Sequence, residues 1–307
     1  MNQLYGIVFV VCAAAAFATL DTTTKYVSVA VPFAVVMWFR FGFQVLTTSA
    51  WLAHRTGTWC LASQHLRLQM YRGVLLSLSS ILAFFSLKLI PVGDFTAIMM
   101  LTPLLMTVVA ALAMNEQVSR LRWLLVCMGF VGAMVVIRPG HDGFTWGAVL
   151  PLVLVLTSAG FQMLTYKLAQ LDDAATTHAY TGWIGFAMAS SALPFVWQDA
   201  VAGWSVASVQ LGVSAWIVAA LLLLIAVSAT MGHSLLIKGY AHAPVAVLTP
   251  YLYVQIPFAV FGGWLVFAHR LDGWTLLGIV IIAISGVLGT WLTARERQAD
   301  LHMVLDN

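Results

Sequence analysis

The sequence predicts an all-α membrane protein with ten transmembrane helices in two inverted five-helix repeats. Hydrophobic residues make up 62% of the 307-residue chain, and charged residues make up only 8%. A soluble domain contains about 25% charged residues, so this chain has too little polar surface to face water on all sides. Long apolar runs follow one another along the whole chain, and the second half repeats a segment of the first.

Ten apolar runs are long enough to cross a bilayer, which takes about 20 residues. The connections between them are short, so no inserted soluble domain is expected. The first run is not interpreted as a cleaved signal, because the residues before it include no Lys or Arg. The predicted spans are 4–28, 32–53, 70–90, 92–114, 120–138, 146–169, 177–197, 212–238, 243–268 and 273–293.

The repeat is clearest in one segment of each half. Pro91–Glu116 reads PVGDFTAIMMLTPLLMTVVAALAMNE, and Pro244–His269 repeats its pattern at an offset of 153 (244 − 91). Five spans per copy is an odd number, so the second copy enters the membrane from the opposite side, as in transporters with inverted repeats. We expect residues 1–140 and 141–294 to form the two repeats and 295–307 to form a cytoplasmic tail.

Lys and Arg predict the orientation, because cytoplasmic loops carry an excess of them. With the N-terminus inside, nine of the 14 Lys and Arg residues fall on the cytoplasmic side, Arg72 among them, and four on the other. Arg40 lies within a span. Both termini are therefore predicted to be cytoplasmic.

Arg40 lies about 12 Å into its predicted span, at 1.5 Å per residue. A charge at that depth is costly, so it should face protein or a water-filled cavity. Asp21, at a similar depth in the preceding span, is its predicted partner, with Lys25 one turn further out. The pair either joins two helices structurally or opens into a substrate cavity, and both interpretations stay open.

Polar residues also recur at positions related by the repeat. Asp21 corresponds to Gln162 at an offset of 141 (162 − 21), and Ser80 corresponds to His233 at 153. His233 binds substrate, carries a proton, or is hydrogen-bonded to a neighbouring helix. We expect a substrate-binding cavity between the repeats that draws on Phe17, Asp21, Trp38, Arg40, Ser80, Phe84, Gln162, His233, Tyr253 and Gln255.

Two other residue types have predicted structural roles. Pro103, Pro250 and Pro257 lack the N–H that a helix needs and should permit bending. The glycines of the last span in each repeat indicate close helix packing; they are Gly129, Gly132, Gly278, Gly286 and Gly289.

The chain resembles the EamA family of the drug/metabolite transporter superfamily over its whole length. The similar passages are DTTTKYVSVAVPFAVVMWFRF, AIMMLTPLLMTVVAALAMNEQVSRLRWLLVCMGFVGAMVVI and AHAPVAVLTPYLYVQIPFAVFGGWLVFAHRLDGWTLLGIVIIAISGVLG. The chain departs from the family pattern at His269, where an acid is frequent. The resemblance implies a multi-pass protein of the bacterial inner membrane that moves a small metabolite by alternating access.

The predicted site suits a small amphipathic solute, an amino acid or a related zwitterion, and export is the expected direction. Import of a vitamin or nucleoside-like metabolite, such as riboflavin or S-adenosylmethionine, and export of an opine metallophore remain alternatives. A non-transporting membrane component and a channel-like facilitator are the rival classes. The sequence has no enzymatic or metal-binding motif and no nucleic-acid patch, so the expected partners are a small molecule and the lipid bilayer, with no cofactor, in a monomer or homodimer.

Overall fold

The computed structural model describes residues 3–56, 63–105, 108, 119–138, 149–196, 210–243, 245–269 and 271–305. Glu116, the end of the predicted 92–114 span and the start of the predicted 146–169 span lie outside these residues. All regular elements within them are helical: α1 (Gln3–Val27), α2 (Phe33–Thr56), α3 (Leu66–Leu89), α4 (Val92–Met99), α6 (Arg120–Ile137), α7 (Leu150–Ala169), α8 (Ala174–Ala192), the 3-10 helix η2 (Leu193–Val196), α10 (Ala215–His242), α11 (Val245–Leu252), α12 (Gln255–Phe267) and α13 (Gly273–Leu305).

Six of the described helices are long and apolar enough to cross a membrane: α1, α2, α3, α6, α7 and α10. Three further apolar segments are shorter, at Val92–Leu105, Gln255–Phe267 and Gly273–Gly289. Helix α8 is long enough but less apolar, because its first turns carry a cluster of threonines with His178. Those side chains are buried in the protein, so α8 does not expose them to lipid. The chain is a multi-pass membrane protein.

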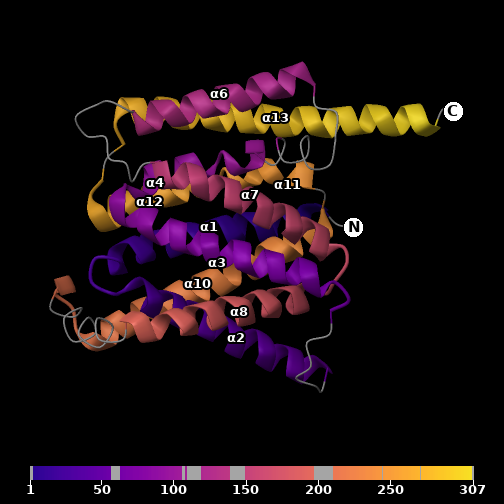
Figure 1. Cartoon of the computed structure of the whole chain (residues 1–307). Coiled ribbons are helices and arrows are strands. Elements are labelled where there is room, and N and C mark those ends of the chain that lie inside the picture. Colours follow the sequence, from indigo (N-terminus) through magenta and orange to yellow (C-terminus); the bar gives the residue numbers. More distant parts are fainter. Residues whose placement is uncertain are drawn as a thin grey trace.

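The helices form one bundle in which chain neighbours are often not neighbours in space (Figure 1). Helix α6 packs along α13 at one side of the bundle, and α2 packs along α8 at the opposite side. Between these pairs, α1 packs against α10 and α12, and α3 packs against α7 and α8. The start of α1 and the end of α13 lie at the same end of the bundle, called here the terminal end (Figure 1). The other end, which holds Pro91 and Arg138, is called the distal end.

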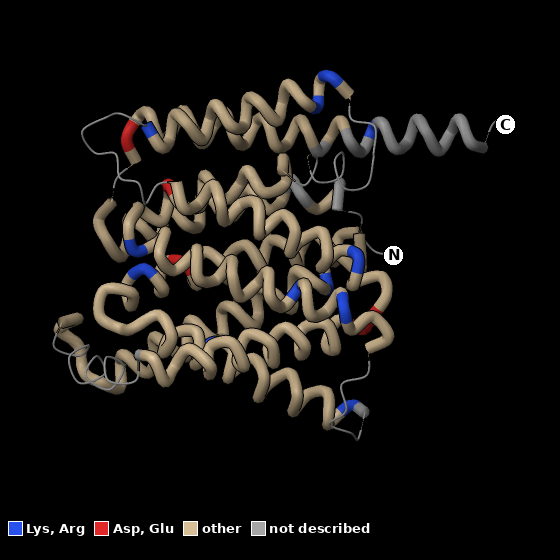
Figure 2. Tube along the Cα trace, viewed as in Figure 1, with Lys and Arg blue, Asp and Glu red and all other residues tan. Residues whose placement is uncertain are grey.

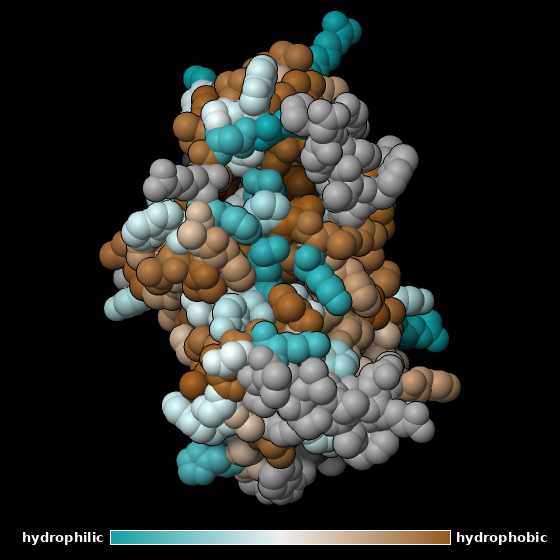
Figure 3. Space-filling view, turned by 90° about the vertical axis from the view of Figure 1, so that its left-hand side faces the viewer, coloured by the Kyte–Doolittle hydropathy of each residue, from teal (hydrophilic) through white to brown (hydrophobic). Residues whose placement is uncertain are grey.

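Charge is distributed as a membrane protein requires. Most Lys, Arg, Asp and Glu residues of the described chain lie toward the two ends of the bundle (Figure 2). Seen from the distal end, hydrophilic side chains form a column along the middle, bordered by hydrophobic ones (Figure 3). Arg40 and Arg72, by contrast, are buried inside the bundle.

Two helices are interrupted at positions related by the repeat. Helix α4 stops before a turn at residues 100–101, and α11 is separated from α12 by a turn at residues 253–254. Each turn lies just before a proline, Pro103 or Pro257, whose ring crowds the carbonyl four residues earlier. The predicted bends at these two prolines are confirmed, whereas Pro250 lies within α11.

The groups freed by these interruptions find partners inside the protein. The Thr102 hydroxyl donates to the carbonyl oxygen of Met99, the one that Pro103 cannot reach, at 2.7 Å. The hydroxyl of Tyr253 donates to the carbonyl oxygen of Met100 at 3.2 Å and so joins the two interruptions directly. The Tyr253 hydroxyl fits here because Gly286 of α13 has no Cβ to overlap it.

Glycines set the spacing of α6 and α13, as predicted. A Cβ on Gly278 would lie 2.7 Å from the carbonyl oxygen of Gly132, and one on Gly132 would lie 3.0 Å from the carbonyl oxygen of Gly278. Both contacts are with backbone, which cannot move aside as a side chain can. The two helices therefore approach as closely as their main chains permit, which is typical of membrane helix pairs.

The structure corrects two expectations about helix ends. Helix α3 begins at Leu66, earlier than predicted, so Arg72 is not a residue of the cytoplasmic surface but a fully buried residue of the bundle. Helix α13 runs to Leu305, past the predicted end of its span, and projects beyond the other helices at the terminal end (Figure 1).

Replacing Gly278 by Val should destabilise the protein by about 1–3 kcal/mol, because the added side chain meets backbone of α6 that cannot yield. The measurement is the apparent Tm of the purified protein in detergent. Gly273→Ala is the control, since no atom lies within 4 Å of its added Cβ. Equal Tm values for the two variants would contradict the close packing of α6 on α13.

Candidate functional site

Arg40 joins three helices in the middle of the bundle. Its side chain extends from α2, and the residue is only 5% exposed. Nη1 donates to the Ser80 hydroxyl of α3 at 2.7 Å, and Nη2 lies 3.2 Å from Nε2 of His233 on α10. Arginine can only donate, so Nε2 of His233 accepts and the proton of the neutral ring is on Nδ1. The guanidinium also lies 5.0 Å from the ring centre of Phe41.

The predicted ion pair between Asp21 and Arg40 is not formed. Asp21 instead accepts a hydrogen bond from Nε2 of Gln255 on α12, at 3.2 Å. The physical reason is packing: α1 lies against α10 and α12, whereas α2 lies against α8 and α10. The two opposite charges attract each other only at longer range.

Lys25 has a different role from the one expected. Its Nζ donates to the carbonyl oxygens of Leu87 and Ile90, at 2.8 and 2.7 Å. These carbonyls are at the C-terminal end of α3, where the helix leaves its last acceptors without intrahelical partners. Lys25 therefore caps α3 rather than extending the Asp21 group.

Arg72 is a second buried arginine, and sequence reasoning missed it. It is 0% exposed, and its Nε donates to the Thr165 hydroxyl of α7 at 2.8 Å. Its Nη1 donates to the carbonyl oxygen of Thr177, at 3.1 Å, and to the hydroxyl of Thr181, both on α8. The guanidinium lies 4.7 Å from the ring centre of Phe161. An arginine inside a predicted span, as for Arg40, is the signal that could have revealed it.

Two histidines lie between the arginines. The His233 and His178 ring centres are 6.5 Å apart, and the Phe161 ring lies 5.6 Å from that of His233. His178 is held by Gln44 of α2, whose Nε2 donates to the His178 carbonyl at 2.9 Å and lies 3.3 Å from its Nδ1. We call Arg40, Arg72, His178 and His233 the central polar cluster.

Each member of the central polar cluster has a buried nitrogen without a protein partner. These atoms are Nε of Arg40, Nη2 of Arg72, Nε2 of His178 and Nδ1 of His233. Leaving a buried polar group unpaired costs about 1–3 kcal/mol, and most such groups in proteins have partners. Four unpaired groups gathered in one place are typical of a binding site rather than of a structural core.

At the terminal end, Asp172 ties the connection between α7 and α8 to the start of α3. It accepts hydrogen bonds from Ser63 at 2.5 Å and Gln69 at 2.8 Å, and His65 lies 3.4 Å away. Burial raises the pKa of Asp172, but these hydrogen bonds outweigh it and hold the pKa below its usual value. Gln69 also donates to the hydroxyl of Thr177, whose carbonyl accepts from Arg72. The Asp172 contacts are thereby connected to the central polar cluster.

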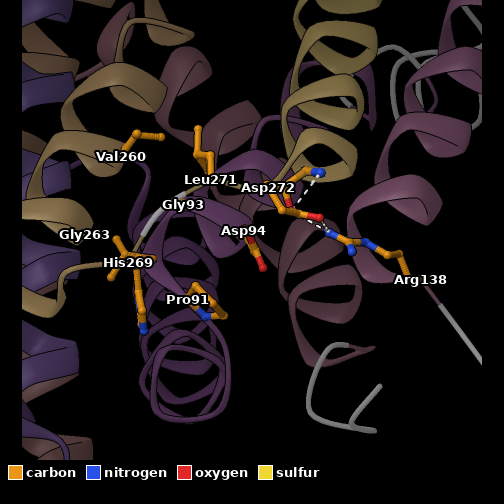
Figure 4. A pocket seen from close by; sticks show the side chains of 11 residues that line it. Pro91, Gly93, Asp94, Arg138, Val260, Gly263, His269, Leu271 and Asp272 are labelled. Carbon is orange, nitrogen blue, oxygen red and sulfur yellow. Dashed lines mark hydrogen bonds and ion pairs between the residues drawn. The ribbon is translucent and has the colours of Figure 1, made fainter. Parts of the chain in front are cut away.

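At the distal end lies a pocket of about 190 Å³ between α4, α6, α12 and α13 (Figure 4). Arg138 pairs there with Asp272 and donates to the Thr275 hydroxyl at 3.1 Å, which joins the end of α6 to the start of α13. Burial raises the pKa of Asp272, but hydrogen bonds from Thr275 and Arg138 lower it below its usual value overall. Asp94 and His269 also line the pocket.

The structure brings only part of the predicted site together. Phe17 packs edge-on against His233, with 4.9 Å between ring centres, so Phe17, Arg40, Ser80 and His233 converge. The other predicted residues have partners of their own. Trp38 packs on Phe186 and Phe84 packs on Phe33, while Gln162 accepts a hydrogen bond from the Tyr240 hydroxyl. Asp21 is hydrogen-bonded to Gln255, and Tyr253 lies in the separate core that includes residues of α4, α6 and α13.

Asp172→Asn should lower stability by roughly 1 kcal/mol at pH 7, because the hydrogen bonds to a carboxylate are replaced by weaker ones. Asp172 has a lowered pKa in the folded state, so its contribution is present above about pH 4 and is lost as the pH falls through the folded value. The measurement is the apparent Tm of both proteins between pH 7 and pH 3. A Tm difference that grows toward low pH would contradict this account.

Comparison with known proteins shows that the chain is similar to transporters. Residues 4–138 match the family described as EamA-like transporter family. A riboflavin transporter of Vibrio cholerae is 25% identical over 97% of this chain and 97% of its own length. A pseudopaline exporter of Pseudomonas aeruginosa is 24% identical over 91% of this chain and 94% of its own. An S-adenosylmethionine uptake transporter of Rickettsia bellii is 23% identical over 85% of each chain.

A solved crystal structure superposes with a TM-score of 0.62 and covers 94% of this chain and 98% of its own. Its sequence identity is 13%, so this likeness concerns the fold alone. The family match covers the first half, while the named relatives extend along nearly the whole chain. The first part of the chain is thus similar to the EamA-like transporter family, and the whole chain is similar to the named transporters.

Proposed function

We propose that the protein is a secondary transporter that exports a small amphipathic metabolite, an amino acid or a related zwitterion, across the bacterial inner membrane. The observation that carries this proposal is the central polar cluster, with its four unpaired buried nitrogens next to Phe17 and Phe161. Such a site offers polar groups to the charged part of a solute and aromatic rings to its apolar part. The proposed orientation has both termini in the cytoplasm.

Alternating access between two inverted repeats, residues 1–140 and 141–294, is the proposed mechanism. In chain order, α1, α2, α3, α4 and α6 of the first half correspond to α7, α8, α10, α11–α12 and α13 of the second. Exchanging each helix for its counterpart turns the α1–α10 contact into the α7–α3 contact. The same exchange leaves the α2–α8 and α6–α13 pairs unchanged, as a two-fold relation requires. The two helix interruptions, separated by 153 residues (253 − 100), also support this reading.

The contacts at the two ends of the bundle support a cycle in which each end closes in turn. Asp172 holds the terminal end, and the Arg138–Asp272 pair holds the distal end. Neither group is a member of the central polar cluster, although Gln69 and Thr177 link the Asp172 contacts to Arg72. The interrupted helices supply places where the backbone can bend.

Import of a vitamin or nucleoside-like metabolite is the second candidate. It is favoured by the names of two of the relatives, the riboflavin transporter and the S-adenosylmethionine uptake transporter. Export of an opine metallophore is supported by the pseudopaline exporter. Proteoliposomes loaded with unlabelled amino acids, riboflavin or S-adenosylmethionine, then given the labelled compound outside, should show counterflow for the true substrate class. Absence of counterflow, with passive flux instead, would indicate a facilitator.

Single cysteines at Gln162 and His233 should react with a water-soluble thiol reagent, because both positions are proposed to face the substrate path. The background needs Cys12, Cys60 and Cys127 replaced. The compound that shows counterflow should protect both positions. A cysteine at Leu223, which is exposed on the outer face of α10, is the lipid-facing control and should stay unreactive. Unreactive cysteines at both test positions would mean that Gln162 and His233 are packing residues.

A further inference from the structure

The two buried arginines lack the counter-charge that buried arginines normally have. Among the described residues, ion pairs involve Arg55, His65 and Arg138, and neither Arg40 nor Arg72. The partners of Arg72 are two hydroxyls, one carbonyl and an aromatic ring. Those of Arg40 are a hydroxyl, a thioether, an imidazole and a ring. Neutral groups of this kind orient a guanidinium but leave its charge uncompensated.

Both arginines are buried in the bundle, well inside the ends of their helices. Arg40 is seven residues from the start of α2 and Arg72 six residues from the start of α3, which places each about 10 Å along its helix. A single charge deep in a membrane helix costs about 2.5–3.5 kcal/mol on insertion scales and is usually paired. Asp21 attracts Arg40 at longer range, whereas Arg72 forms no ion pair with a carboxylate of the described residues and is fully buried. Arg72 is therefore the residue that most needs an anion.

All four unpaired nitrogens of the central polar cluster are donors. Those of the arginines carry hydrogen in every state. His233 accepts from Arg40 at Nε2, so its unpaired Nδ1 carries the proton. The amide nitrogen of Gln44 donates to the His178 carbonyl, which fixes the amide orientation; Nδ1 of His178 then accepts and its unpaired Nε2 carries the proton.

An acceptor with negative charge suits a cluster that presents unpaired donors and two positive charges. Carboxylates and phosphates are acceptors of this kind, and arginine binds both in bidentate geometry. Resting on the proposed transport function, we infer that the central polar cluster binds an anionic group of the substrate, a carboxylate or a phosphate, with Arg72 as its main charge partner. The apolar part of the substrate then lies toward Phe17 and Phe161.

The test is direct binding by the full-length protein in detergent at constant ionic strength. The probes are 3-phenylpropionate, succinate and inorganic phosphate, with phenethylamine as a cation of similar size to the first. At least one anion should raise the apparent Tm in a saturable way, and phenethylamine should not. Arg72→Gln should raise the half-saturating concentration of that anion at least about tenfold, which corresponds to about 1.4 kcal/mol.

Two further variants keep the result interpretable. Arg72→Lys keeps the positive charge and serves as the test variant if Arg72→Gln does not fold. It should weaken binding less than Arg72→Gln does, but should still bind more weakly than wild type because lysine lacks the guanidinium fork. Arg55→Gln is the matched control: Arg55 is an exposed arginine of α2 whose only described ion pair is with Asp173 at the surface, and binding should be unchanged. Stabilisation by none of the anions, or equal binding by the Arg72 variants and wild type, would overturn the inference.

Counterflow and binding can fail separately. A protein that transports a compound but shows no Arg72-dependent anion binding would retain the proposed function and lose the anion site. A protein that binds anions through Arg72 but shows no counterflow of any tested compound would retain the site and lose the transport proposal. Whether carboxylate or phosphate is the group bound is decided by which probe saturates at the lower concentration.

Discussion

No water reaches the hydrocarbon core of a bilayer, so each polar group carried into it must find its partner inside the protein. Most of this bundle follows from that constraint. Hydroxyls such as those of Ser80 and Thr181 donate to the carbonyl one turn earlier in their own helices. The carbonyls freed near the interruptions receive hydrogen bonds from Thr102 and Tyr253. In the central polar cluster, four buried nitrogens are left without a partner in the protein.

The sequence predicted most of the helices, because the thickness of the bilayer sets the length that an apolar run needs to span it. Helices were found near every predicted span in the described chain, and the bends at Pro103 and Pro257 appeared where proline removes a donor. The start of α3 was wrong because Gln69 and Arg72 read as surface residues. They are buried by α7 and α8, and the burial of a polar residue by distant helices leaves no mark in the local pattern.

The candidate site was predicted in part. Arg40, Ser80 and His233 were identifiable because each is a polar residue in an apolar span. They converge because polar residues in apolar spans turn away from lipid and toward the interior of the bundle. The predicted ion pair between Asp21 and Arg40 was wrong. Equal depth in the membrane does not imply contact, because consecutive helices need not pack together. Arg72 and His178 were missed because both lie near the ends of predicted spans, where a charge or an imidazole normally faces water.

In the proposed alternating-access cycle, the hydrogen bond between Tyr253 and Met100 would affect how the two halves move. It joins the interrupted helix of the first half to that of the second, in a buried core where Gly286 leaves room for the Tyr253 hydroxyl. Straightening or bending one helix alone would strand a hydroxyl and a carbonyl without partners, at the full desolvation cost of both. The two interruptions are thus thermodynamically linked, and intermediates with only one half rearranged are disfavoured. A single shared hydrogen bond at the crossing makes concerted motion the low-energy route.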